Sequence, residues 1–173
     1  INKNANRTSI RIRHKKIKQR RTKMKKVGFI GLGNMGSKMV KNLLQANYEI
    51  IGYDINENLV DKLVPNGLHK ASNLNEITDD VDVIITMLPN GEIVEKVYEN
   101  IIDKLKPETL LTDCSTIDVK TAKDLHKMCS DKNLLSLDAP VSRGVGGAEN
   151  GTLTFIIGGN EKAYDLMLPL FEA

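Results

Sequence analysis

The sequence has few of the residues that build metal centres and disulfide frameworks. It contains no Trp, two Cys and three His in 173 residues. Cys114 and Cys129 do not form a C-x-x-C pair, and the histidines are isolated from one another. These absences argue against a zinc site and a disulfide framework, and they fit a reducing compartment. We therefore expect no bound metal, and we interpret Cys114 as a buried strand residue and not as a catalytic thiol.

Long hydrophobic runs are also missing. No stretch approaches the roughly 18 to 20 consecutive apolar residues that a membrane-spanning helix needs. The sequence therefore predicts a soluble protein without a membrane partner.

Acidic residues are absent from one end of the chain. Residues 1–26 hold 12 of the 25 Lys and Arg and none of the 22 Asp and Glu, so the remaining 147 residues, with 13 basic side chains, have a net charge of −9. An acidic body gives no reason to expect that it binds nucleic acid. Residues 1–25 begin at Ile1, and Met24 offers a natural start. We interpret residues 1–25 as disordered or untranslated, with a targeting peptide or a nucleic-acid-binding arm as alternatives.

In the body, apolar runs of strand length alternate with segments of helical period. Strands are predicted at 26–31, 49–54, 81–89, 109–116, 134–142 and 152–159, and helices at 33–45, 57–63, 91–105, 118–132 and from 161. This alternation predicts an α/β fold of Rossmann type over residues 26–173, with a doubly wound, mostly parallel sheet and helices on both faces. Asn47 is predicted to take the left-handed position that ends the first helix.

A glycine cluster follows the first predicted strand. It has the spacing G-x-G-x-x-G and consists of Gly31, Leu32, Gly33, Asn34, Met35 and Gly36. The spacing alone is a weak signal, but between a strand and a helix it indicates a dinucleotide-binding turn. The first glycine permits the turn, the second lets the backbone approach a pyrophosphate, and the third lets the helix pack closely on the strand. Free N–H groups at the helix start would then meet the phosphates. A glycine turn in a protein that binds no nucleotide remains the alternative.

Asp54 indicates which dinucleotide is bound. It ends the next predicted strand, and its carboxylate can accept hydrogen bonds from the ribose hydroxyls of NAD while repelling the 2′-phosphate of NADP. No arginine follows it, because the next residues are Ile55, Asn56 and Glu57. The predicted cofactor is therefore NAD.

Four segments together point to a known family. In chain order they read FIGLGNMGSKMVKNLL, TMLPN, DCSTID and DAPVSRGVGGAENGTLTFIIGG. With them the chain resembles the β-hydroxyacid dehydrogenase family over residues 26–173, above all its 3-hydroxyisobutyrate dehydrogenase branch. In that family this stretch is the N-terminal cofactor domain, and an all-helical domain follows it. The chain departs from the family pattern at Val40, where Ser or Ala is usual, and at Asn47, where Gly is usual.

The resemblance implies further NAD contacts. They come from the 31–36 loop, from Asp54, from Leu88 and Pro89 after one strand, and from Thr116 after another. The residues by themselves leave simpler interpretations open. Pro89 could merely end a strand and start a helix, and Thr116 could be the N-cap of the helix predicted at 118–132.

The stretch 138–159 is predicted to run from a strand through a glycine-crowded turn into a second strand. In the resembled family it reads D-A-P-V-S-G-G and binds the substrate's carboxylate, which implies this role for Ser142, Arg143 and Gly144. A serine hydroxyl can donate a hydrogen bond, and glycines leave backbone N–H groups accessible to an anion. Arg143 stands where the family usually has glycine, so it could clamp the carboxylate or fill the pocket and change the substrate. A simple glycine-rich connection is the alternative.

The implied function is NAD-dependent oxidation of a small 3-hydroxy acid, with 3-hydroxyisobutyrate, which gives methylmalonate semialdehyde in valine breakdown, as the first candidate. In the family the proton is handled by a lysine in the motif G-x-x-G-x-G-x-x-x-K-x-x-x-N, which this sequence does not contain. We therefore expect the sequence to be a fragment that lacks the all-helical domain with this lysine. No catalytic residue is then expected among these 173, and the fragment should bind NAD with little or no turnover.

Two other functions stay open. One is a reductase of tartronate semialdehyde, succinic semialdehyde or glyoxylate, and the other is a non-enzymatic, chromatin-associated relative that has lost the lysine. Members of the family are homodimers or homotetramers, mitochondrial in eukaryotes and cytoplasmic in bacteria, and we expect the same of the full-length protein.

Overall fold

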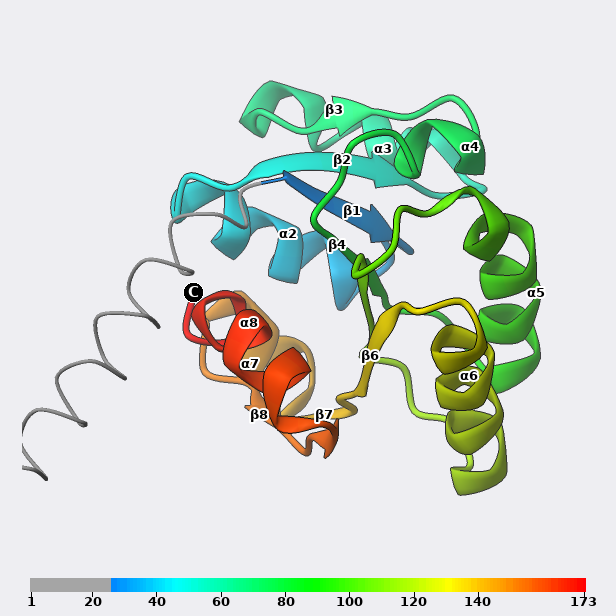
Figure 1. Cartoon of the computed structure of the whole chain (residues 1–173). Coiled ribbons are helices and arrows are strands. Elements are labelled where there is room, and N and C mark those ends of the chain that lie inside the picture. The colour runs from blue at the N-terminus through cyan, green and yellow to red at the C-terminus, as the bar shows by residue number, and fades with distance from the viewer. Residues whose placement is uncertain (1–25) are drawn as a thin grey trace, which may run out of the picture.

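The computed structural model describes residues 26–173, so the prediction for residues 1–25 lies outside the described residues. A seven-stranded sheet with the order β3-β2-β1-β4-β5-β6-β9 forms the centre of this part, and β7 and β8 form a separate pair (Figure 1). The strands are β1 (Lys26–Ile30), β2 (Glu49–Tyr53), β3 (His69–Lys70), β4 (Val83–Thr86), β5 (Leu110–Asp113), β6 (Leu135–Asp138), β7 (Val141–Ser142), β8 (Thr154–Phe155) and β9 (Gly158–Gly159). The α-helices are α2 (Gly36–Gln45), α3 (Glu57–Asp61), α4 (Leu74–Ile77), α5 (Gly91–Ile101), α6 (Val119–Asp131), α7 (Gly144–Glu149) and α8 (Glu161–Phe171), with 3₁₀ turns at Val64–Asn66 and Ile102–Lys104.

The sheet has the predicted parallel arrangement with a reversal of strand order at its centre. Strands β1 to β6 pair in parallel, and only β9 runs antiparallel to its neighbour β6. From β1 the chain adds β2 and β3 on one side and then returns to place β4 on the other side of β1. Ligands of open α/β sheets bind outside the carboxyl ends of the strands at such a switch point. The fold therefore directs attention to the loops that follow β1, β2 and β4.

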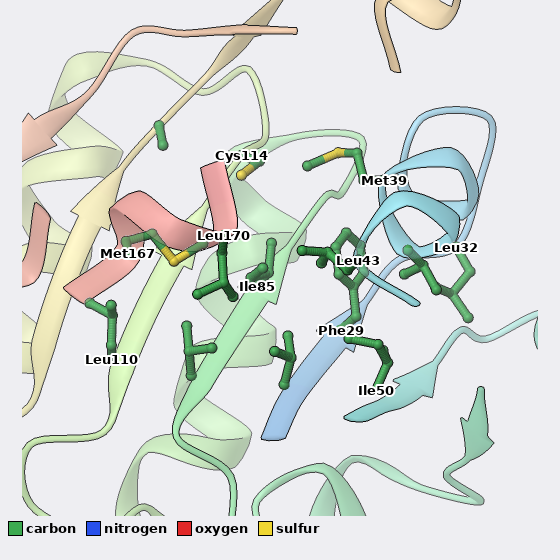
Figure 2. Packing of buried hydrophobic residues seen from close by; sticks show 14 of the residues in the cluster. Phe29, Leu32, Met39, Leu43, Ile50, Ile85, Leu110, Cys114, Met167 and Leu170 are labelled. Atoms are coloured by element: carbon green, nitrogen blue, oxygen red, sulfur yellow. The ribbon is translucent and has the colours of Figure 1, made fainter. Parts of the chain in front are cut away.

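Helices cover both faces of the sheet, as the sequence predicts. Val83 and Ile85 point into a core shared with α2, α7 and α8, where Met39, Leu43, Met167 and Leu170 pack on the strands (Figure 2). Ile84 points to the opposite face, into a second core shared with α4, α5 and α6. The consecutive apolar residues of β4 thus serve two cores, which is typical of a strand buried on both sides.

The prediction that residues 138–159 form a strand, a turn and a second strand is wrong. The chain leaves β6 at Ala139 and Pro140, forms the short strand β7, and then turns into the helix α7. The strand predicted at 152–159 is two separate strands, since β8 pairs with β7 and β9 pairs with β6. Pro140 has no N–H to donate to a continuous ladder, which accounts for the break after β6.

The end of α2 follows the prediction for Asn47, which adopts a left-handed conformation with φ 63°. Its backbone N–H donates to the carbonyl of Leu44, so the turn closes the helix. Three small elements, β3, α4 and the 3₁₀ turn at Val64–Asn66, were not predicted.

Candidate functional site

The three glycines of the G-x-G-x-x-G turn differ in whether the surrounding structure leaves room for a side chain. At Gly31, where φ is 96°, a Cβ atom would lie 2.3 Å from the carbonyl oxygen of Met87. At Gly36 a Cβ atom would lie 1.9 Å from the carbonyl oxygen of Gly31, so helix α2 can approach β1 only without a side chain there. At Gly33 a Cβ atom would meet nothing within 4 Å. The fold therefore requires the first and third glycines, whereas the second leaves open space beside the backbone.

Asp54 is fixed beside this turn. It follows β2 directly, and its Oδ2 accepts a hydrogen bond from the backbone N–H of Leu32 over 2.7 Å. Its Oδ1 accepts from the N–H of Asn56 over 2.8 Å. The side chain of Leu32 is fully buried in the core (Figure 2). Leu32 therefore serves the site through its backbone, and each Asp54 oxygen keeps a lone pair for a ligand.

A cleft of about 410 Å³ opens at the switch point. It brings together most of the predicted cofactor residues, namely Gly31, Gly33, Asn34, Met35, Gly36, Asp54, Leu88 and Pro89. Its wall also contains apolar side chains that were not predicted as site residues, namely Ile55, Leu74, Ile93 and Val97. Ile55 is 93% exposed although it is large and apolar. Ile55 directly follows Asp54 in the sequence. This position is the one feature of the sequence from which a contact between Ile55 and an apolar part of the ligand could have been predicted.

The residues after β4 and β5 lie at the same edge of the sheet. Pro89 directly precedes Asn90, whose side chain caps α5, and Thr116 stands two residues before Asp118, whose side chain caps α6. Thr116 is therefore not the N-cap of α6, which removes the simpler interpretation of that residue. Thr116 is exposed but is not among the residues that line the 410 Å³ cleft.

The predicted substrate residues form a corner outside this cleft. Ser142 ends β7, Arg143 adopts a left-handed conformation with φ 85°, and Gly144 follows with φ 58°. All three are exposed, and a Cβ atom on Gly144 would meet nothing within 4 Å. The Arg143 Nε donates to Thr154 Oγ1 over 3.1 Å. The left-handed backbone accounts for the glycine that the resembled family usually has at position 143.

The two cysteines are buried in the two cores and take no part in the cleft. Burial raises the pKa of the Cys114 thiol far above its usual range and raises the pKa of Cys129 to about 12. Neither thiol is ionised near neutral pH, so Cys114 has the structural role that the sequence indicates.

Residues 26–173 show neither a metal centre nor a membrane-spanning helix. No group of three or more His, Cys, Asp and Glu side chains in this part of the chain is arranged to hold a metal ion. No helix of the same part is long and apolar enough to cross a membrane.

The doubly wound sheet and the glycine-lined cleft at its switch point define a dinucleotide-binding domain of Rossmann type. Residues 26–173 match the family model described as the NAD binding domain of 6-phosphogluconate dehydrogenase. The chain belongs to this family, and its cofactor is accordingly NAD.

Individual relatives are dehydrogenases of small hydroxy acids. The chain is 41% identical to the NAD-dependent L-serine dehydrogenase of Pseudomonas aeruginosa over 87% of its own length and 51% of the relative's. It is 40% identical to the mitochondrial 3-hydroxyisobutyrate dehydrogenase of Drosophila melanogaster, over 86% and 46% of the two chains. Among solved structures, Mycobacterium tuberculosis 3-hydroxyisobutyrate dehydrogenase with L-serine superimposes with a TM-score of 0.84 at 38% identity, over 86% and 51%. The chain thus spans about half the length of the curated relatives it matches.

Proposed function

We propose that the chain is the cofactor domain of an NAD-dependent dehydrogenase that oxidises a small 3-hydroxy acid. The observation that carries the proposal is that Gly33 and the fixed carboxylate of Asp54 line one cleft. The packing around Gly33 leaves room for a side chain, so the fold itself does not explain why this residue is glycine. Bare backbone suits the approach of a pyrophosphate, and the carboxylate suits the ribose hydroxyls of NAD.

The chain's own residues would bind and orient the cofactor. NAD supplies the hydride acceptor when it is bound. At the start of α2 the N–H groups of Ser37 and Lys38 donate to the carbonyls of Gly33 and Met35. The N–H groups of Asn34, Met35 and Gly36 would therefore be the ones that face the pyrophosphate beside Gly33. Asp54 would accept from the ribose hydroxyls and would repel a 2′-phosphate, so we propose that Asp54 selects NAD over NADP. The apolar wall formed by Ile55, Leu74, Ile93 and Val97 would hold the adenine.

The proposed substrate has a primary alcohol next to the carbon that bears the carboxylate. The names of the relatives support this class, because 3-hydroxyisobutyrate and L-serine share the unit HO–CH₂–CH(X)–COO⁻ and differ only in a methyl or an ammonium group as X. We propose 3-hydroxyisobutyrate as the first substrate, oxidised to methylmalonate semialdehyde, and L-serine as the second candidate. Reduction of a related aldehyde acid and a non-enzymatic role rank behind both.

Ser142, Arg143 and Gly144 are proposed to hold the substrate's carboxylate. Thr154 uses only the Nε of Arg143, which leaves the terminal guanidinium nitrogens without a hydrogen bond among residues 26–173. A guanidinium presented in this way can bind a carboxylate with two parallel hydrogen bonds. We further propose that the full-length protein is a homodimer or homotetramer, located in mitochondria if its source is eukaryotic, as the name of the Drosophila relative suggests, and in the cytoplasm if it is bacterial.

Calorimetric titration with NAD⁺ and NADP⁺ tests the cofactor proposal on this chain. We expect NAD⁺ to bind at least about tenfold more tightly than NADP⁺, and the Asp54→Asn variant to lose most of that preference. Tighter binding of NADP⁺ by the unaltered chain would contradict the role of Asp54. The reaction is tested with the sequence extended to the relatives' full length, by comparing NADH formation from 3-hydroxyisobutyrate and from L-serine. No NADH from either substrate would refute the proposed reaction.

A further inference from the structure

A buried chain of hydrogen bonds leads from β5 to the loop after β4. The backbone N–H of Leu88 donates to Ser115 Oγ over 2.9 Å, and Ser115 Oγ donates to Asp113 Oδ1 over 2.6 Å. Ser115 is fully buried and Asp113 is 2% exposed. We call the hydrogen bonds that join Leu88, Ser115 and Asp113 the Asp113 relay. Because Leu88 lines the 410 Å³ cleft, this relay connects a buried carboxylate with the wall of the candidate cofactor site.

Asp113 also contacts the end of β4 itself. Its Oδ1 accepts from Thr86 Oγ1 over 2.7 Å and from the backbone N–H of Ser115 over 3.2 Å. Thr86 is the last residue of β4 and stands opposite Asp113 in the parallel register. One carboxylate oxygen therefore fixes the last residue of β4 directly, and it fixes the loop two residues further on through Ser115.

The same loop is confined on its other side by the glycine turn. The N–H of Met87 donates to the carbonyl of Ile30 over 2.9 Å, and the carbonyl oxygen of Met87 fills the space that a side chain on Gly31 would need. The backbone at Met87 and Leu88 thus lies between the glycine turn and the Asp113 relay.

A carboxylate at position 113 lowers the free energy of unfolding, because the ionised form is unfavourable when it is buried. Burial raises its pKa, because the ionised carboxylate loses hydration that its hydrogen bonds with Ser115 and Thr86 only partly replace. Its Oδ2 has no hydrogen-bond partner among the described residues, and the same is true of Oδ1 of Asp138, which stands opposite it on β6. A carboxylate kept under these conditions suggests a task beyond packing.

We propose that Asp113 and Ser115 are positioning residues that hold the backbone at Leu88 in the form that the cofactor requires. The inference rests on the proposed NAD function of the cleft. Neither side chain would touch NAD, and both would act through the hydrogen bond that Ser115 accepts from the Leu88 N–H.

The Ser115→Ala variant of the 173-residue chain tests the proposal, because it removes one hydroxyl and leaves the rest of the side chain in place. We expect the dissociation constant for NAD⁺, measured by calorimetry, to rise about tenfold, which is the loss expected from one displaced contact. Hydrogen exchange should accelerate at the Leu88 amide and stay unchanged at the amides of β1. An unchanged NAD⁺ affinity together with a protected Leu88 amide would overturn the proposal.

Thr112→Val is the matched control. Thr112 lies on β5, three residues before Ser115, and is equally buried, but its hydroxyl has no hydrogen-bond partner among the described residues. Replacing it with an isosteric apolar side chain should leave both NAD⁺ affinity and Leu88 exchange as they are. If Thr112→Val weakens NAD⁺ binding as much as Ser115→Ala does, the effect comes from β5 in general and the relay is refuted.

Asp113→Asn supplies the conservative rescue. Asparagine keeps an acceptor oxygen for Ser115 and Thr86, so NAD⁺ affinity should remain within about threefold of the unaltered chain, whereas Asp113→Ala should lose about tenfold. Equal losses in both variants would overturn the relay.

The exchange experiment also separates the two levels of inference. If the unaltered chain does not bind NAD⁺, the proposed function fails, while faster Leu88 exchange in Ser115→Ala would still show that Ser115 fixes the loop.

Discussion

The side-chain amide of Asn42 donates a hydrogen bond to the backbone carbonyl of Ala148 over 2.8 Å. The two residues are far apart in the sequence and join α2, which begins in the glycine turn, to α7, which begins after Arg143. The helix that would face the pyrophosphate and the helix that follows the proposed carboxylate site are thus connected by a specific polar contact.

Removing this contact should loosen α7. We expect Asn42→Ala to lower the free energy of unfolding by about 1 kcal/mol, because the Ala148 carbonyl loses its donor in a partly buried place. Hydrogen exchange should accelerate within Gly144–Glu149. Asn100→Ala is the control, since the amide of Asn100 donates only to the carbonyl of Lys96 within its own helix and is exposed. An equal loss in both variants would show that the contact between α2 and α7 has no special weight.

Replacement by alanine should reduce stability at Gly36 and NAD⁺ binding at Gly33. Gly36→Ala should lower stability by about 2–3 kcal/mol, since its Cβ would overlap the carbonyl of Gly31. Gly33→Ala should change stability by less than about 0.5 kcal/mol. It should weaken NAD⁺ binding at least about tenfold, because the new methyl group occupies space proposed for the pyrophosphate. Thermal unfolding and calorimetric titration measure the two effects, and undiminished NAD⁺ binding by Gly33→Ala would contradict the proposed site.

Arg143 is expected to lower stability through its left-handed backbone while its guanidinium strengthens binding of the substrate's carboxylate. Arg143→Gly should raise stability by about 0.5 kcal/mol, because a left-handed conformation costs roughly 1 kcal/mol with a side chain and the flexibility of glycine offsets part of that gain. Arg143→Lys keeps the strain and should gain nothing. Both variants should bind 3-hydroxyisobutyrate more weakly in the presence of NAD⁺, since neither offers a planar guanidinium. If the lysine variant binds the acid as well as the unaltered chain, Arg143 is no clamp.

Asp80 predicts a small dependence of stability on pH. Its carboxylate contacts Lys26 and Lys106, each over 2.9 Å, and hydrogen bonds with Lys106 first and Lys26 second lower its pKa to about 2. Because this pKa lies below that of the unfolded chain, the contribution is complete above about pH 4 and is lost as the pH falls towards 2. Asp80 adopts a left-handed conformation with φ 56°, which asparagine also tolerates. Asp80→Asn should therefore melt slightly lower at pH 7 and show only a small part of this difference at pH 2. The difference should shrink in high salt, and a difference that persists at pH 2 would assign it to another cause.

The two cysteines should be unreactive in the folded chain. Cys114 and Cys129 are fully buried, and burial raises the pKa of Cys129 to about 12 and that of Cys114 further. A chromogenic disulfide reagent at pH 8 should therefore react with neither thiol in native protein and with both in denaturant. Rapid modification of one thiol in native protein would mean that its core opens locally, and the Cys114→Ala variant would identify which one.

The elements that could be predicted are those with a local pattern. The central strands are apolar on consecutive residues, and the glycine turn and Asp54 have characteristic spacing, so both the sheet and part of the cleft follow from short segments. Strand β3 could not be predicted, because His69 and Lys70 are exposed and carry no apolar signal. Helix α7 was hidden because three of its six residues are glycine, and glycine disfavours helices in isolation.

The positioning relay was beyond the sequence for another reason. Leu88 and Ser115 are 27 residues apart, and nothing in either segment indicates that a backbone N–H of one meets a hydroxyl of the other. The parallel register that sets Thr86 opposite Asp113 creates this contact. A role that depends on which strands become neighbours is accessible only once the strand order is known.

The sheet ends on both sides in strands of only two residues, β3 at one edge and β9 at the other. Unpaired backbone at a sheet edge is a template for adding a strand from another molecule, and short edges with a lysine, as at Lys70, offer little of it. The longer strands β2 and β6 lie just inside them, paired with β3 at Ile51 and Gly52 and with β9 at Leu137 and Asp138. Loss of β3 or β9 would therefore expose a longer strand edge, and self-assembly through the sheet is disfavoured while both stay paired.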